Sequence, residues 1–110
     1  MKKIAIPSDG DQFAQHFGRC PEYNIFEIEN DEIKNQKVIS NPGHQPGFLP
    51  KFLSEKGVDC IICRGMGRKA QDLFDENNIE VILGVSGNFE EKVNSYIKGE
   101  LEEGENLCSH

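Results

Sequence analysis

The alternation of hydrophobic and polar residues predicts five β-strands along the chain. In each of five segments, apolar residues either alternate with polar ones or form a short unbroken run, which is typical of strands. The third segment is polar at most positions, which suits an exposed edge of a sheet. The predicted strands are residues 3–8, 23–29, 32–40, 58–63 and 79–83.

Apolar residues spaced three or four positions apart predict three helices between and after these strands. Gly57 and Gly99 follow the first and third stripes, where glycine commonly ends a helix. The three apolar stripes are Phe48, Leu49, Phe52 and Leu53; Met66, Ala70, Leu73 and Phe74; and Phe89, Val93, Tyr96 and Ile97.

The predicted element order is β-β-β-α-β-α-β-α. Because crossovers between parallel strands are right-handed, this order favours a mixed five-stranded sheet in which the second strand is antiparallel and helices cover both faces. We therefore expect an α/β fold, a ribonuclease H-like three-layer α/β/α arrangement with strand order 3-2-1-4-5. Residues 9–19 show no period and are predicted to be a loop. Residues 1–99 are expected to form one domain, followed by a solvated acidic tail, 100–110.

Composition narrows the function classes. The chain has 110 residues and a net charge of −7, which argues against a nucleic-acid binder or a protein of anionic membrane surfaces. Its first apolar stretch, Ile4 to Ile6, is far shorter than a signal peptide requires. We expect a cytoplasmic protein in which the four cysteines do not form disulfides.

Soft metal ligands are predicted to meet at one edge of the sheet. Ligands in open α/β sheets bind at the carboxyl ends of the strands, near the point where the strand order reverses. Sulfur and imidazole groups suit iron–sulfur species, zinc or copper(I). The residues predicted to lie at this edge are His16, Cys20, His44, Cys63 and Met66.

Cys60 and Cys63 have the spacing of a redox C-x-x-C motif but lie in a predicted strand. Redox chemistry of that motif needs a helix N-terminus, whereas positions three apart on a strand point to opposite faces. We therefore interpret Cys60 as a core residue.

Two glycine-rich turns join a predicted strand to a predicted helix. Gly65-Met66-Gly67 and Gly84-Val85-Ser86-Gly87 allow backbone N–H groups to approach an anion, such as a phosphate or a metallocluster. Neither matches a known nucleotide-binding fingerprint, and each is also explained as a tight turn. At the end of the chain, Cys108 and His110 form either a ligand pair or a frayed terminus.

Read together, several motifs resemble the dinitrogenase iron–molybdenum cofactor biosynthesis family, the NifX/NifB-type domain. The resemblance covers nearly the whole chain and is carried by the order of the segments His16 to Pro21, Pro42-Gly43-His44, Gly57-Val58-Asp59, Gly65-Met66-Gly67, Gly84 to Gly87 and Asn106 to His110.

This resemblance implies a ribonuclease H-like fold that binds an iron–sulfur or iron–molybdenum cluster, or its precursor, for delivery. Members usually have small residues where this chain has Cys63 and Arg64. Carried over motif by motif, the resemblance points to His16, Cys20, His44, Gly65, Met66, Gly67, Cys108 and His110. Together with the residues singled out at the sheet edge and in the turns, the expected metal ligands are His16, Cys20, His44, Cys63, Cys108 and His110, and the expected cofactor-binding positions are Arg19, Gly65, Met66, Gly67, Ser86 and Gly87.

Three functions follow as hypotheses. The first is a non-catalytic carrier or scaffold, a monomer or homodimer, that passes a metallocluster between donor and acceptor proteins. The second is a small-anion or nucleotide-binding regulatory module without metal. The third is a hydrolase of the ribonuclease H type, which needs several carboxylates around two metal ions. Asp9 ends its predicted strand and is suitably placed, whereas Asp59 begins its strand and therefore lies at the wrong end of the sheet.

Overall fold

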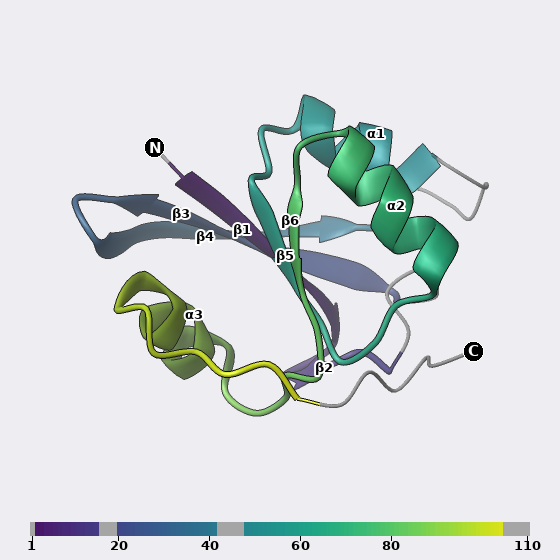
Figure 1. The fold of residues 1–110 in the computed structure, drawn as a ribbon. Coiled ribbons are helices and arrows are strands. Elements are labelled where there is room, and N and C mark those ends of the chain that lie inside the picture. The colour runs from purple at the N-terminus through teal and green to yellow at the C-terminus, as the bar shows by residue number, and fades with distance from the viewer. Residues whose placement is uncertain (1, 16–19, 42–47, 105–110) are drawn as a thin grey trace.

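The chain forms one mixed sheet flanked by three helices (Figure 1). The computed structural model describes residues 2–15, 20–41 and 48–104. A mixed α/β fold with one mixed sheet and three helices was predicted, and it is confirmed. The elements are β1 (Lys2–Asp9), β2 (Gln12–Phe13), β3 (Glu22–Glu29), β4 (Glu32–Ser40), α1 (Phe48–Glu55), β5 (Cys60–Ile62), α2 (Arg68–Glu76), β6 (Glu80–Ile82) and α3 (Phe89–Ile97).

The strands are arranged in the order β4-β3-β1-β5-β6, and β2 pairs with β1. β3 is antiparallel to both of its neighbours, while β1, β5 and β6 are parallel. The carboxyl ends of these three parallel strands therefore lie along one edge, which we call the carboxyl edge.

The prediction that residues 9–19 form only a loop is wrong in part, because β2 lies within them. Gly10 turns the chain at a φ of +66°, and Phe13 then pairs with Ser8 of β1. Phe13 is buried and its ring packs edge-on against Phe89 of α3, with centroids 5.2 Å apart. A strand of two residues is too short to produce a period, so the pattern could not reveal it.

The sheet separates two apolar cores. Alternate residues of β1 point to opposite faces, so Ala5 packs under α1 and α2 whereas Ile4 and Ile6 pack under α3. Leu53 of α1 and Phe74 of α2 are fully buried on the first face. Val93 of α3 is fully buried on the second.

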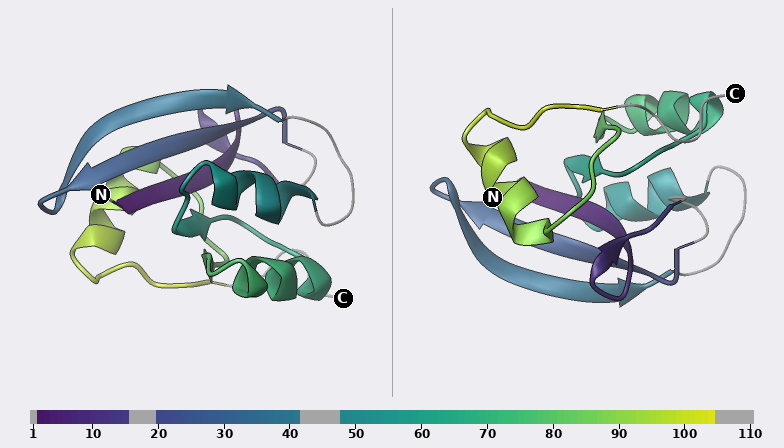
Figure 2. Two further views of the ribbon diagram at one scale, coloured as in Figure 1. Left: turned by 90° about the horizontal axis from the view of Figure 1, so that it is seen from above. Right: turned by 90° about the horizontal axis from the view of Figure 1, so that it is seen from below.

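β3 and β4 form a hairpin that extends past the rest of the sheet (Figure 2). Asn30 and Asp31 make its turn, with φ angles of 54° and 61°. Two consecutive left-handed residues match the twist of the strands that they join. β4 is largely exposed at the edge of the sheet, as its polar pattern predicted.

The second helix begins later than predicted. Met66 was assigned to its apolar stripe, but α2 starts at Arg68 and Met66 lies fully buried in the preceding turn. β5 is likewise shorter than the predicted residues 58–63. Met66 is thus a core residue of the turn between β5 and α2.

The chain turns back after α3. Residues 101–104 run toward the end of β6, where the Gly104 amide donates to the Leu83 carbonyl oxygen at 3.0 Å. Within the described part of the chain, no helix combines the length and the apolar character needed to span a membrane.

Candidate functional site

Two of the predicted ligands, Cys20 and Cys63, meet at the carboxyl edge. Cys20 precedes β3, whose first residue Glu22 pairs with Ser8 near the end of β1, and Cys63 directly follows β5. Both thiols belong to the apolar core under α1 and α2, where they are 3% and 1% exposed. The other four predicted ligands, His16, His44, Cys108 and His110, lie outside the described residues, and so does Arg19.

The buried hydroxyl of Tyr23 lies beside both thiols. Tyr23 is fully buried and forms a side-chain hydrogen bond with Cys20. Burial raises the pKa of Tyr23 well above its ordinary value, and the charges of Cys20 and then Cys63 raise it further. Tyr23 was not among the predicted site residues, although a tyrosine at an inward-facing strand position needs a polar partner for its hydroxyl.

The environment of Cys20 opposes ionisation of its thiol but contains several hydrogen-bond donors. Burial raises the pKa of Cys20, whereas hydrogen bonds from Tyr23 and from the backbone of Ser8, Cys20 and Glu22 lower it. The net shift is upward, so the thiol is protonated near neutral pH. A metal ion that displaced this proton would leave a sulfur already surrounded by donors.

A cavity of about 440 Å³ opens beside Cys20. It brings the thiol together with a carboxylate, from Asp9, and a guanidinium, from Arg64. In the sequence, Arg64 is distinguished only as a departure from the family pattern. The lining residues are Asp9, Gln12, Phe13, Ala14, Gln15, Cys20, Pro21 and Arg64.

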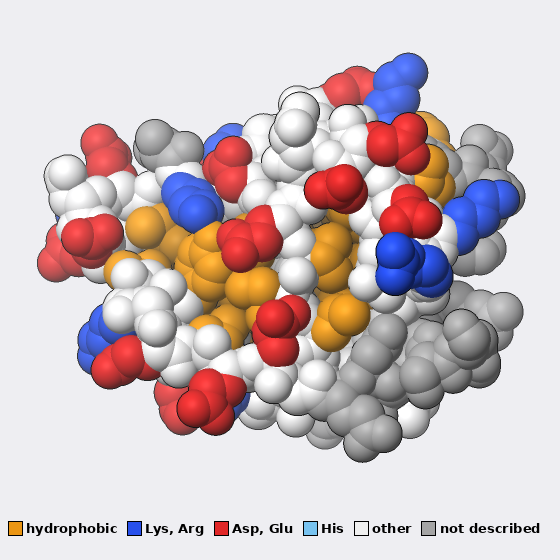
Figure 3. Space-filling view, in the orientation of Figure 1, with side chains coloured by type: hydrophobic (Ala, Val, Ile, Leu, Met, Phe, Trp, Pro, Cys, Tyr) orange, Lys and Arg blue, Asp and Glu red, His pale blue; other side chains and the backbone are white. Residues whose placement is uncertain are grey.

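The start of α2 is suited to an anion. Gly67 is the N-cap and provides no side-chain hydrogen bond, and the first turn holds no acidic residue. Arg68 and Lys69 occupy that turn instead, and basic side chains gather over this end of α2 (Figure 3). Free N–H groups and positive charge at a helix N-terminus favour an anionic ligand.

The start of α3 is less suited to an anionic ligand than the start of α2. The Asn88 side chain accepts a hydrogen bond from the Glu91 amide at 2.8 Å, and Glu90 and Glu91 lie in the first turn. Ser86 and Gly87 are exposed on this loop and do not line the cavity beside Cys20. The two glycine-rich turns therefore differ in their capacity to hold an anion.

Cys60 lies on the opposite face of the sheet from Cys63, as the strand period predicted. It is fully buried in the core under α3, and burial, followed by the charge of Glu80, raises the pKa of its thiol to about 12. Cys20, Cys60 and Cys63 form no disulfide with one another. Among the described residues, no three His, Cys, Asp or Glu side chains are grouped closely enough to hold a metal ion.

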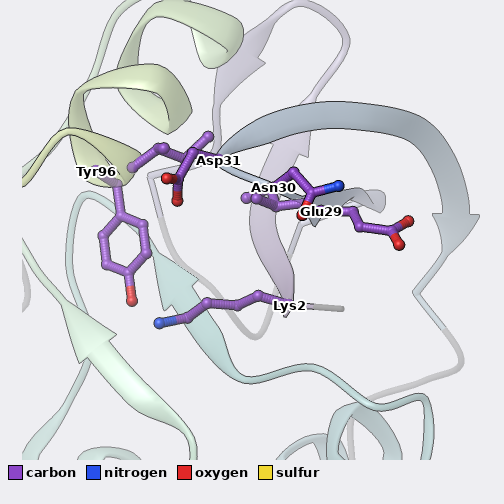
Figure 4. Close-up of a pocket in the computed structure, with 7 residues that line it drawn as sticks. Lys2, Glu29, Asn30, Asp31 and Tyr96 are labelled. Carbon is purple, nitrogen blue, oxygen red and sulfur yellow. The ribbon is translucent and has the colours of Figure 1, made fainter.

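The largest cavity described, about 730 Å³, lies at the other end of the sheet, between the hairpin turn and α3 (Figure 4). Two of its polar side chains, those of Lys2 and Tyr96, already have interaction partners. Lys2 Nζ lies 4.8 Å from the centre of the Tyr96 ring, and the Tyr96 hydroxyl donates to Glu80 Oε1 at 2.6 Å. Because this cavity contains no thiol or imidazole among its lining residues, we place the candidate site at the carboxyl edge despite its smaller volume.

Comparisons with known proteins agree with the motifs. The chain is 34% identical over 110 residues to the uncharacterized protein MJ0580 of Methanocaldococcus jannaschii, covering 96% of this chain and 93% of that protein. The crystal structure of PH0822 is similar with a TM-score of 0.86 and 30% identity, covering 96% of each chain. The crystal structure of MJ0327, also from M. jannaschii, has a TM-score of 0.76 and 27% identity, covering 94% of this chain and 95% of that one.

A family profile described as "Dinitrogenase iron-molybdenum cofactor" matches residues 1–99, and these residues include the strands, the helices and both buried thiols of the carboxyl edge. The chain therefore belongs to the dinitrogenase iron-molybdenum cofactor family.

Proposed function

We propose that this protein is a non-catalytic carrier or scaffold that binds an iron–sulfur or iron–molybdenum type cluster, or its precursor, and delivers it to a partner. The observation that carries the proposal is that Cys20, which precedes β3, and Cys63, which follows β5, lie in one core beside Tyr23 at the carboxyl edge. In this function the cluster is the cargo, so the site binds and releases it and catalyses no reaction.

The chemistry of this edge suits such cargo. Thiolates are preferred ligands of iron–sulfur species, and the donors around Cys20 would stabilise a metal-bound thiolate. Arg64 and the start of α2 provide positive charge for an anionic cluster. We propose as ligands His16, Cys20, His44, Cys63, Cys108 and His110, with Arg19, Gly65, Met66, Gly67, Ser86 and Gly87 as further contacts.

The wider context follows from this role. We assign the architecture to the ribonuclease H-like group and place the protein in the cytoplasm as a monomer or homodimer, with cluster donor and acceptor proteins as partners. Nuclease chemistry gains no support, because Asp59 accepts a hydrogen bond from the Lys3 amide at the opposite end of β5 from Asp9.

Anaerobic reconstitution with iron and sulfide tests the proposal. We expect a visible charge-transfer band and stoichiometric iron in the wild type, and a large loss of both in the double variant His16→Ala with Cys20→Ala. A colourless wild-type protein without bound iron would refute the carrier function. Unchanged iron content in the double variant would refute the assigned ligands.

A second function is favoured by one observation, the uncapped start of α2 with Arg68 and Lys69. A regulatory module that binds a small anion would use these N–H groups without metal. It predicts an increase in the melting temperature with inorganic phosphate or a nucleotide and none with iron and sulfide. The carrier proposal predicts the reverse.

A further inference from the structure

The segment that follows α3, residues 100–104, runs from the end of that helix to the end of β6 (Figure 1); we call it the strap. The Glu100 amide donates to the Ser95 carbonyl oxygen at 2.8 Å, which turns the chain as it leaves the helix. Leu101 then packs against the apolar core under α3. The beginning of the strap is therefore held by the helix and by the core beneath it.

The far end of the strap is bound to the edge of the sheet. β6 is the last strand of the described sheet, so one of its sides is open to the strap. The Leu83 amide donates to Glu103 Oε1 at 3.2 Å, and the Leu83 carbonyl oxygen accepts from the Gly104 amide at 3.0 Å. Both backbone groups of Leu83 thus have partners in the strap, which covers an edge position that another strand could pair with.

The strap and the loop after β6 approach so closely that both need glycine. A Cβ atom added to Gly84 would clash with the backbone of Gly104, and one added to Gly104 would lie 2.5 Å from the Gly84 carbonyl oxygen. Gly84 also has a φ of +74°, which side chains disfavour. The two segments therefore pack backbone against backbone, and a movement of one requires a movement of the other.

The loop after β6 carries this contact to the carboxyl edge. The Gly84 amide donates to the Arg64 carbonyl oxygen at 3.2 Å, and the Val85 amide donates to the Cys63 carbonyl oxygen at 3.1 Å. Arg64 lines the cavity beside Cys20, and Cys63 shares a core with Cys20. The residue that the strap packs against is thus the one that holds the backbone of Arg64.

The turn that carries Arg64 lies between two regular elements. β5 ends at Ile62 and α2 starts at Arg68, so residues 63–67 belong to neither the ladder nor the helix. The backbone groups of such a turn need partners in neighbouring segments, and two of its carbonyl oxygens accept from the loop after β6. A displacement of that loop is therefore transmitted first to Cys63 and Arg64.

We propose that the strap positions Cys63 and Arg64 at the carboxyl edge, with Gly84, Glu103 and Gly104 as the positioning residues. None of these three lines the cavity at that edge, so they act through the backbone that they hold in place. The consequence for a bound cluster rests on the proposed function, whereas the positioning itself needs no cargo.

Amide hydrogen exchange tests the positioning without any metal. We expect the Gly84 and Val85 amides to exchange at least about threefold faster in Glu103→Ala than in the wild type, because local opening there does not require global unfolding. The amides of β1, which is paired on both sides, report global opening and should exchange at the wild-type rate.

Matched variants separate the hydrogen bond from the loss of a charged side chain. Glu103→Gln keeps an oxygen that can accept from the Leu83 amide and should restore the wild-type exchange rates. Glu102→Ala removes an exposed neighbouring glutamate and should leave the rates unchanged. Gly104→Ala places a Cβ atom against Gly84 and should accelerate exchange more than Glu103→Ala does.

Unchanged exchange of Gly84 and Val85 in Glu103→Ala, or an equal acceleration of the β1 amides, would overturn the positioning. A Glu103→Gln variant that exchanged as fast as Glu103→Ala would overturn it as well. Glu103→Ala keeps the test decisive if Gly104→Ala does not fold, because it removes a single acceptor from an exposed segment.

The rate at which a chelator removes iron from the reconstituted protein tests the consequence for the cargo. We expect a severalfold faster loss from Glu103→Ala than from Glu102→Ala, because residues that hold metal ligands in place contribute to metal affinity. Equal rates from the two variants, when the wild type binds iron, would overturn this consequence and leave the proposed function intact. A wild type without bound iron would refute the proposed function, whereas the exchange rates would still decide the positioning.

Discussion

Each face of the sheet buries a thiol next to a tyrosine, yet the two pairs differ in what surrounds them. Under α1 and α2, Cys20 and Tyr23 share a core with a second thiol, that of Cys63, and Cys20 also lines a cavity at the carboxyl edge. Under α3, Cys60 interacts with Tyr96, whose hydroxyl is hydrogen-bonded to Glu80 near the amino end of β5.

The comparison shows that a buried cysteine acquires a candidate function from its neighbours. Cys60 and Cys63 are only three residues apart in one strand and the turn that follows it, and both are almost fully buried. The pleat of the strand places Cys60 in a core with no second thiol among the described residues, and Cys63 beside Cys20. We therefore expect Cys60 to contribute to packing and the other two to contribute to metal binding.

The largest effect on stability is expected at high pH, from the face under α3. The pKa of Cys60 is about 12 in the folded protein and near 9.0 for an ordinary thiol, so between these values the unfolded chain releases a proton that the folded chain keeps. The folded state then binds more protons, and the free energy of unfolding falls by up to about 1.4 kcal/mol per pH unit as the pH rises. Urea denaturation at a series of alkaline pH values measures this slope.

Cys60→Ala is the matched variant for that measurement. It removes the titrating thiol and should give a shallower decrease with pH, while the loss of packing shifts all its values by a constant amount. If the slope of Cys60→Ala equalled that of the wild type, the pKa of Cys60 would be the same in the folded and the unfolded chain, which would contradict the prediction.

A smaller effect is expected from the tyrosine of the other face. Tyr23→Phe removes a fully buried hydroxyl that is hydrogen-bonded to Cys20, so the free energy of unfolding should fall by about 1 kcal/mol. The pKa of Cys20 should also rise further, because that hydrogen bond lowers it. Chemical denaturation measures the first change; a variant as stable as the wild type would show that the hydroxyl contributes nothing to the core.

The smallest effect is expected from Tyr96→Phe. The Tyr96 hydroxyl donates to Glu80 in an exposed hydrogen bond, which water replaces readily. We expect a loss of about 0.5 kcal/mol in the same denaturation experiment. A larger loss than that of Tyr23→Phe would reverse the comparison between the two faces.

Much of the fold was predictable because it depends on regular periods. The alternation in β1, β3 and β5 determines which side chains face each core, and it placed Cys60 and Cys63 on opposite faces correctly. β2 was missed because its single buried residue, Phe13, cannot form a pattern. The late start of α2 was missed because Met66 continues the apolar stripe of the helix although it lies in the turn.

Less of the candidate site was predictable, because contacts between distant segments leave no periodic signal. Cys20 and Cys63 were identified by residue type and by their positions at strand ends. The hydrogen bond between Cys20 and Tyr23, and the close approach of Gly84 and Gly104, depend on backbone geometry. Four acidic residues after position 99 predicted a solvated tail, and nothing in the sequence indicated that Leu101 and the Gly104 amide contact the domain.

The most direct test of the account compares the thiols of the two faces as metal ligands. Wild type, the double variant Cys20→Ala with Cys63→Ala, and Cys60→Ala are reconstituted anaerobically with iron and sulfide, and iron per chain is measured on samples whose NMR spectra show a folded protein. The account predicts that Cys60→Ala keeps nearly all of the iron bound by the wild type and that the double variant loses most of it. Full iron content in the double variant, or loss of iron in Cys60→Ala alone, would contradict it.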